Sequence, residues 1–180
     1  MLEIKPIHKS DLKIIWESGY TQPFPKWAMY NAPYFGDYEK VDYRSFKQKY
    51  ANFYLNSNTV HGIYVDEVII GSVTYYYESK KTRWLEAGIL IYSEEYWNKG
   101  YGLKAMRLWF DKLFNDINTI ARIGITTWSG NPGMIKLAEK LRMKKEAEIR
   151  KVRYYEGVYY DSIKYGILRE EWENIDWKDV

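Results

Sequence analysis

The stretch WNKGYGL, residues 97–103, contains the two glycines that decide how this sequence is interpreted. Gly100 and Gly102 directly precede an apolar pattern of helical period over residues 103–117. Glycine lets the backbone approach a ligand closely, and the free N–H groups of a first helical turn bind anions. Lys99 adds a cation beside them. The stretch therefore predicts a phosphate or pyrophosphate site, although a glycine-rich turn that binds nothing has the same spacing.

A second kind of phosphate site, the dinucleotide-binding fingerprint, also fits this spacing if Ala105 takes the third position. That motif requires a strand that runs directly into the first glycine and an acidic residue about 20 positions later. Here residues 93–99 intervene, and the region around Arg122 has no acidic residue before Glu139. The sequence therefore disfavours a dinucleotide site.

The segments around this stretch alternate between strand and helix patterns. Alternating polarity and turn residues predict strands, whereas helical spacing after a capping residue predicts helices. Strands are expected at residues 2–7, 61–65, 68–77, 84–92, 120–127, 149–155 and 158–168, with tight turns at Asp66-Glu67 and Glu156-Gly157. Helices are expected after Asp11, after Asp42 with Phe46, Tyr50 and Phe53 on one face, over 103–117 and after Asn131. The sequence thus predicts a mixed α+β fold, with a central, mostly antiparallel twisted sheet of about seven strands flanked by four helices.

Composition limits the class of protein. The 180 residues are 46% hydrophobic and 28% charged, which indicates one globular domain, expected over residues 1–180. The absence of cysteine excludes thiol catalysis and Cys-ligated metals, and two histidines leave little for a His-based site, so no metal is expected. No apolar stretch reaches the roughly 18–20 residues of a membrane-spanning helix, and residues 1–5 lack the pattern of a signal peptide. We therefore expect a cytoplasmic protein with no membrane partner.

The charge balance also bears on possible partners. The net charge is +3, from 27 basic and 24 acidic residues, which is far from the dense basic face of a nucleic-acid-binding protein. Aromatic residues make up 18% of the chain, and their commoner use is to fill a core rather than to stack on bases. We expect no nucleic-acid partner, and a locally bound anion suits the mild positive charge.

Taken together, these segments resemble the GNAT superfamily of acyl-CoA-dependent N-acetyltransferases, in particular its branch of ribosomal-protein N-terminal and spermidine acetyltransferases. The resemblance rests on the strand LEAGILI at residues 85–91, the loop WNKGYG at 97–102, and Asn131 followed by Leu137, Glu139 and Lys140. It is clearest from residue 85 to about residue 143 and in the closing hairpin, and the order of elements agrees over the whole chain. It implies a GNAT-like fold and an acyltransferase that moves an acetyl group from acetyl-CoA to a primary amine.

The resemblance implies which residues bind the cofactor. Backbone N–H groups of the loop would hold the pyrophosphate of coenzyme A, and the preceding strand would offer backbone groups to the pantetheine arm and the thioester carbonyl. The residues so implied are Ile89, Leu90, Ile91, Asn98, Lys99, Gly100, Tyr101, Gly102, Leu103 and Asn131. The amine attacks the thioester directly, so the chemistry needs no cysteine. The implied partners are acetyl-CoA and an amine acceptor, a protein N-terminus or a small polyamine-like amine.

A base and an acceptor segment follow from the same resemblance. Glu86 stands where the family often has a carboxylate that acts as base through water, and the alternative is a surface or edge-strand glutamate. Trp27, Tyr30 and Tyr34 lie in the segment that matches the acceptor-side loops, where they either line the amine pocket or pack in the core. A monomer and a homodimer both fit the sequence.

Several positions depart from the family's pattern. Trp97 replaces the usual Gln or Arg of the loop, Met134 stands where many members carry Ser, and Ala138 stands where many place a Tyr as general acid. The general acid is therefore unassigned, with Tyr155 and Tyr160 as candidates. These departures leave a second hypothesis open, a non-catalytic CoA-binding or protein-interaction module on the same fold.

Overall fold

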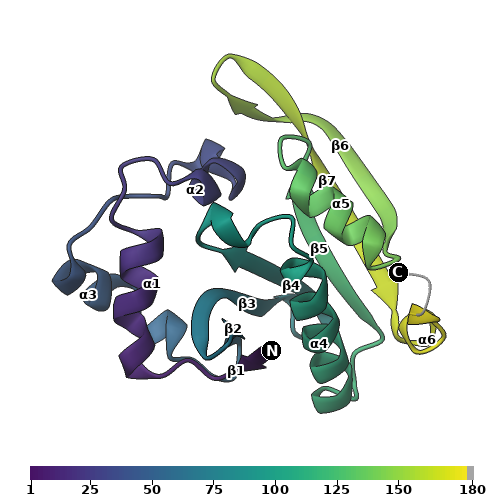
Figure 1. Cartoon of the computed structure of the whole chain (residues 1–180). Helices are drawn as coiled ribbons and strands as arrows, with labels where there is room; N and C mark the ends of the chain where they lie inside the picture. Colours follow the sequence, from purple (N-terminus) through teal and green to yellow (C-terminus); the bar gives the residue numbers. More distant parts are fainter. Residues whose placement is uncertain (178–180) are drawn as a thin grey trace. The chain divides into compact units, whose positions relative to one another are not determined.

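The computed structural model describes residues 1–177, and its elements alternate as predicted (Figure 1). They are β1 (Leu2–Lys5), α1 (Leu12–Gly19), α2 (Lys26–Tyr30), α3 (Tyr43–Tyr54), β2 (Val60–Val65), β3 (Val68–Ser79), β4 (Trp84–Ile91), α4 (Tyr101–Asp116), β5 (Arg122–Trp128), α5 (Pro132–Lys140), β6 (Lys144–Tyr155), β7 (Val158–Leu168) and α6 (Arg169–Glu173). The seven strands have the order β1-β2-β3-β4-β5-β7-β6. The β4–β5 pair is parallel, and the β1–β2, β2–β3, β5–β7 and β6–β7 pairs are antiparallel. The predicted mixed α+β class with a mostly antiparallel sheet is confirmed.

The chain forms two compact units. The first consists of Met1–Tyr75 with Gly88–Leu108, and the second of Tyr76–Ala87 with the described residues from Trp109 onward. The chain passes from one unit to the other within β3, within β4 and within α4. The expectation of a single domain over residues 1–180 stays a prediction.

The core of the first unit is built largely from aromatic rings. The side chains of Tyr20, Phe46 and Tyr54 are almost fully buried, and the Tyr20 ring lies 4.9 Å from the rings of both Phe46 and Tyr50. The side chain of Asp42 caps α3, as predicted, by accepting the N–H of Ser45 at 2.9 Å. The buried face of α3 extends to Tyr54, in keeping with the helical period. Phe53, which the sequence pattern placed on this face, is instead 51% exposed. The high aromatic content is therefore used in the core of this unit.

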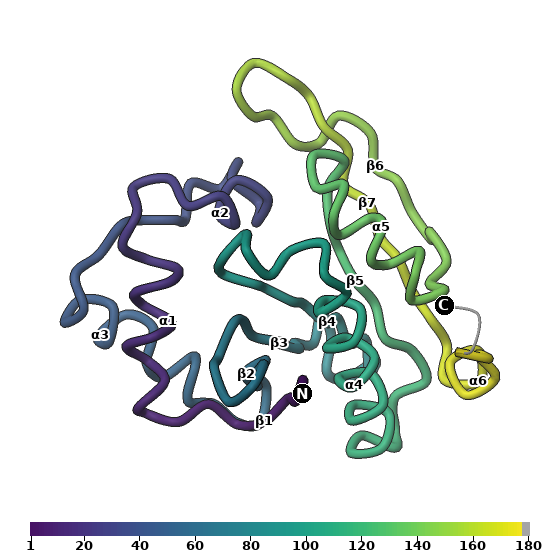
Figure 2. Tube along the Cα trace, in the orientation of Figure 1, coloured from purple at the N-terminus to yellow at the C-terminus, as the bar shows by residue number. Residues whose placement is uncertain are grey.

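The second unit packs aliphatic strand residues and ends in a long hairpin. Ile123 and Ile125 of β5, Ile167 of β7 and Ala138 of α5 are fully buried. Strands β6 and β7 run side by side along the hairpin, as Figure 2 shows. Its turn has φ of 48° at Glu156 and 81° at Gly157, the left-handed pair that the predicted two-residue turn requires.

The aromatic pairs of the hairpin divide between its two faces, as expected from strand alternation. Tyr154 and Tyr159 are exposed and contact each other at 4.9 Å between ring centroids. Tyr155 and Tyr160 instead pack their rings on Trp128, at 6.3 and 4.8 Å.

The described residues form six α-helices where four helices were expected, besides three 3-10 helices of three residues each. The two additional helices, α2 and α6, have five residues each, which is too short to show a helical period. Helix α4 begins at Tyr101, two residues before the expected start, because the glycine stretch itself forms the first helical turn. Within residues 1–177, no helix combines the length and the apolar character that crossing a membrane would require.

Candidate functional site

The loop between β4 and α4 has a backbone that suits anion binding. Asn98 and Gly100 both have positive φ, 57° and 81°. A Cβ added at Gly100 would meet no atom within 4 Å, so the backbone conformation, and not crowding, favours glycine there. Where left-handed residues alternate with residues of ordinary φ, the neighbouring backbone N–H groups point toward one side, as in backbone sites that hold anions. Residues 98–100 are exposed, so a ligand can reach them.

The start of α4 adds further donors in the same unit. The first backbone hydrogen bond of the helix runs from the Lys104 N–H to the Gly100 carbonyl at 3.1 Å. The N–H groups of Tyr101, Gly102 and Leu103 therefore come before it and have no partner inside the helix. Helix α4 has 16 residues, so its dipole places partial positive charge at this end. Together with Lys99, these groups make up the candidate anion site in the first unit, and its binding of a phosphate stays a prediction.

The last residues of β4 lie half-buried against β3. Gly71 of β3 is required there, because a Cβ added to it would lie 2.2 Å from the Leu90 carbonyl oxygen and 3.0 Å from the Ile91 Cα. The Tyr92 N–H donates to the Ile70 carbonyl at 3.0 Å. Burial raises the pKa of Tyr92 to about 12, and its hydroxyl donates to the Ser72 Oγ at 3.3 Å. The backbone expected to meet the pantetheine arm is therefore fixed on its β3 side.

Trp97, the departure at the first loop position, ties the loop to the end of β4. Its indole Nε1–H donates to the Ile91 carbonyl at 3.1 Å. Its ring also meets Tyr30 of α2 edge-on, with 5.9 Å between centroids. A Gln or Arg would not supply both contacts, so this residue has a structural role of its own.

The three predicted acceptor-side residues differ in burial. Trp27 is 6% exposed, and its Nε1–H donates to the Gly19 carbonyl at 2.9 Å, so it has the core position that was the alternative interpretation. Tyr30 and Tyr34 are half-buried, and the Tyr34 ring contacts Phe35 at 4.8 Å. Of the three, Tyr30 is the residue that lies at the candidate loop, because its ring contacts the ring of Trp97.

Glu86 lies in the second unit and is fully buried on β4, between β3 and β5. The alternative of a surface or edge-strand glutamate is therefore wrong. Its carboxylate accepts from Trp84 Nε1 at 2.8 Å, Arg122 Nη1 at 3.2 Å and Thr126 Oγ1 at 2.9 Å. A buried carboxylate needs such partners, because unpaired it would cost several kcal/mol.

The partners of Glu86 were missed in the sequence. Trp84 could have been found, because residues two apart share one face of a strand. Arg122 and Thr126 belong to β5, and only the parallel register, with Leu85 opposite Ile123 and Glu86 opposite Gly124, brings them together. Burial disfavours the charge of Arg122, but its contacts with Glu146 and Glu86 outweigh burial and raise the pKa of the guanidinium.

Asn131 and the two departures downstream also belong to the second unit. The Asn131 Oδ1 accepts the Met134 N–H at 3.0 Å, which confirms the predicted cap of α5. Met134 is half-buried and Ala138 is fully buried, so neither position supplies a hydroxyl. Of the two candidate acids, Tyr155 has its pKa raised by desolvation and by Glu156, so it carries its proton at neutral pH.

A metal site is not apparent in the described part of the chain. Among residues 1–177, no group of three or more His, Asp or Glu side chains is arranged to hold a metal ion.

Comparison with known proteins assigns the fold and the family. Over 85 residues the chain is 38% identical to the SPbeta prophage-derived uncharacterized N-acetyltransferase YokL of Bacillus subtilis (strain 168), a match that covers 44% of this chain and 45% of that protein. Spermidine N-acetyltransferase from Vibrio cholerae, in complex with CoA and spermine, superposes with a TM-score of 0.75 at 19% identity, over 96% of this chain and 98% of that one. A GNAT-family acetyltransferase from Bacillus anthracis gives 0.71 at 21% identity, over 94% and 96%.

A third solved structure, the ribosomal L7/L12 alpha-N-protein acetyltransferase RimL in complex with coenzyme A, gives a TM-score of 0.74 at 12% identity and covers 93% of both chains. At these identities the solved structures establish the GNAT fold alone. Residues 2–144 also match the family described as "Acetyltransferase (GNAT) domain". Since this match spans most of the sequence, the chain belongs to the GNAT acetyltransferase family.

Proposed function

We propose that the chain is an N-acetyltransferase that moves the acetyl group of acetyl-CoA to a primary amine, either a protein N-terminus or a small polyamine-like amine. The observation that carries the proposal is the backbone of residues 98–103, where two left-handed residues precede the first-turn N–H groups of a long helix. A diphosphate accepts hydrogen bonds from such groups, and Lys99 contributes charge. Membership of the GNAT family supports acetyl-CoA as the source of that diphosphate.

The proposed reaction is a direct transfer. The neutral amine nitrogen bonds to the thioester carbonyl carbon, the C–S bond breaks, and the nitrogen loses a proton while the thiolate of CoA gains one. Backbone groups of Ile89, Leu90 and Ile91 bind the pantetheine arm and polarise the carbonyl. Asn131 contacts the cofactor in addition to capping α5, and Tyr30 and Tyr34 border the amine. The chain thus contributes mainly position and polarity.

Glu86 is the proposed base, and it acts through water. Its three hydrogen bonds use most of its acceptor capacity, so the competing role is to hold Trp84, Arg122 and Thr126 in place. Glu86→Gln separates the two roles. Loss of a base lowers kcat by about 10²–10⁴-fold, whereas loss of a purely structural contact lowers the Tm. A lower Tm with an unchanged kcat would refute the catalytic role.

The activity is tested by release of free CoA from acetyl-CoA in a panel of acceptors, with ribosomal-protein N-terminal peptides beside polyamines. Steady thiol release with any amine supports the proposal, and the acceptor that gives the highest kcat/KM names the substrate class. Acetyl-CoA should also raise the Tm, because a ligand that binds only the folded state stabilises it.

The residues Met134 and Ala138, which lack hydroxyls, favour one second candidate, a CoA-binding module without turnover. Stabilisation by acetyl-CoA without thiol release from any acceptor would support it. Absence of stabilisation at millimolar acetyl-CoA would refute both proposals.

A further inference from the structure

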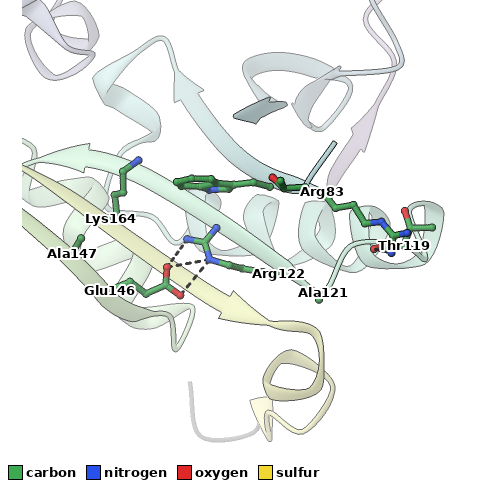
Figure 3. A pocket seen from close by; sticks show the side chains of 9 residues that line it. Arg83, Thr119, Ala121, Arg122, Glu146, Ala147 and Lys164 are labelled. Atoms are coloured by element: carbon green, nitrogen blue, oxygen red, sulfur yellow. Dashed lines mark hydrogen bonds and ion pairs between the residues drawn. The ribbon is translucent and has the colours of Figure 1, made fainter. Parts of the chain in front are cut away.

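The second unit contains a pocket of about 430 Å³ that the proposed reaction does not use (Figure 3). Its lining includes Arg83 and Trp84 at the start of β4, Arg122 at the start of β5, and Glu146 and Lys164 from the β6–β7 hairpin. The volume falls in the range of roughly 300–1,000 Å³ that is typical of small-molecule sites.

One wall of the pocket is a fixed ion-pair network. Arg122 Nε donates to both carboxylate oxygens of Glu146, at 3.1 and 3.3 Å, as Figure 3 shows, and its Nη1 donates to the buried Glu86 at 3.2 Å. Its Nη2 donates to the Glu146 Oε2 at 2.5 Å and to the Tyr165 carbonyl at 3.3 Å. Two carboxylates therefore neutralise this guanidinium, and four of its five N–H donors are used. Arg122 shapes the pocket but carries little uncompensated charge.

Two other cations of the lining have no carboxylate partner among the described residues. Lys164 Nζ donates to the Thr126 Oγ1 at 3.0 Å, which leaves two of its three donors for a ligand. Arg83 Nη1 donates to the Thr119 carbonyl at 3.3 Å, which is also a neutral partner. The pocket therefore presents uncompensated positive charge, which attracts an anion and repels an amine or a polyamine.

Trp84 gives the same pocket an aromatic surface that is already oriented. The residue is 43% exposed, and its Nε1–H donates to the Glu86 Oε1 at 2.8 Å, which fixes the direction of the indole. The Lys164 ammonium lies 5.5 Å from the centroid of this ring. A ring held in place, with a cation already close to it, reduces the entropy lost when a flat ligand binds.

We propose that this pocket binds a small aromatic carboxylate. The ligand ring stacks on Trp84 and its carboxylate pairs with Lys164, with Arg83 adding long-range attraction. The proposal does not depend on acetyl transfer, because the ligand contacts none of the residues proposed to bind acetyl-CoA; Trp84 also donates to Glu86, the proposed base. Pairing at a partly exposed lysine is worth about a fivefold change in affinity. A minimal ligand with one such pair should bind with a millimolar dissociation constant.

The probes are 4-fluorobenzoate and its uncharged analogue 4-fluorobenzamide, titrated against the full-length protein and detected by fluorine NMR of the ligand. The benzoate should bind saturably and about fivefold more tightly than the amide. Lys164→Met should remove that difference and leave amide binding unchanged. Trp84→Leu should weaken both ligands, and Lys136→Met, at an exposed lysine of α5, should change neither.

The proposal is overturned if benzoate binding does not saturate, if the amide binds equally well, or if Lys164→Met has no more effect than the Lys136→Met control. If Lys164→Met does not fold, Arg83→Gln is the second variant, and it should weaken benzoate alone. The titration is repeated with saturating coenzyme A. Unchanged benzoate binding supports a separate pocket, whereas displacement would assign the ligand to the cofactor site and refute the inference.

Discussion

Gly71→Ala tests whether the close approach of β3 and β4 holds the backbone that is proposed to bind acetyl-CoA. The added Cβ would lie 2.2 Å from the Leu90 carbonyl oxygen and 3.0 Å from the Ile91 Cα. Both atoms belong to backbone, so no rotamer change relieves the contact, and one strand must move by about 1 Å to restore normal packing distances. Overpacking of this kind costs about 1–3 kcal/mol.

At about 2–4 °C per kcal/mol for a chain of this size, the Tm should fall by roughly 2–12 °C. If the shift moves the Leu90 and Ile91 backbone, the KM for acetyl-CoA should rise while the acceptor KM changes less. Thermal melting and initial rates of CoA release measure the two effects.

Gly133→Ala is the matched control. Gly133 lies in the first turn of α5, where the nearest atom to an added Cβ is the Asn131 Oδ1 at 3.7 Å. Alanine favours a helix by up to about 1 kcal/mol over glycine, so this variant should be as stable as the wild type or more so. A Gly71→Ala protein with the Tm and KM of the wild type would refute the reasoning about the β3–β4 contact.

Three further predictions concern the described contacts. Trp97→Phe keeps a ring but removes the donor to the Ile91 carbonyl; urea unfolding should show a loss of about 1–3 kcal/mol, and the acetyl-CoA KM should rise. Arg122→Met leaves Glu86 buried without its cation and should cost about 3–5 kcal/mol in the same assay, while the double variant with Glu86→Gln should recover part of it; an additive double variant would contradict the pairing. The pKa of Tyr92 is raised, so the unfolded chain ionises first and stability should fall as the pH rises from 10 to 12; Tyr92→Phe should show a smaller fall in alkaline urea titrations, and equal slopes would count against the burial effect.

Local features of the chain were predictable because their physics is local. Caps at Asp42 and Asn131, and the turn at Glu156-Gly157, depend on side chains and backbone angles within a few residues, and all three occur as expected. The short helices α2 and α6 were missed for the same reason, because five residues give no periodic pattern. Phe53 was placed on the wrong side of α3, since its spacing fits a helical face as well as that of the truly buried Tyr54.

The sequence by itself determined the alternation of strands and helices, and the glycine pair at the start of α4, because both depend on short-range periodicity and on the freedom of glycine. Only the tertiary structure decided the surroundings of Glu86. Arg122 and Thr126 contact its carboxylate because β4 and β5 pair in parallel in this register. Glu146 of β6 in turn contacts Arg122. Such contacts join residues 24 to 40 positions apart along the chain, and their energy depends on burial and pairing, which no local pattern of residues specifies.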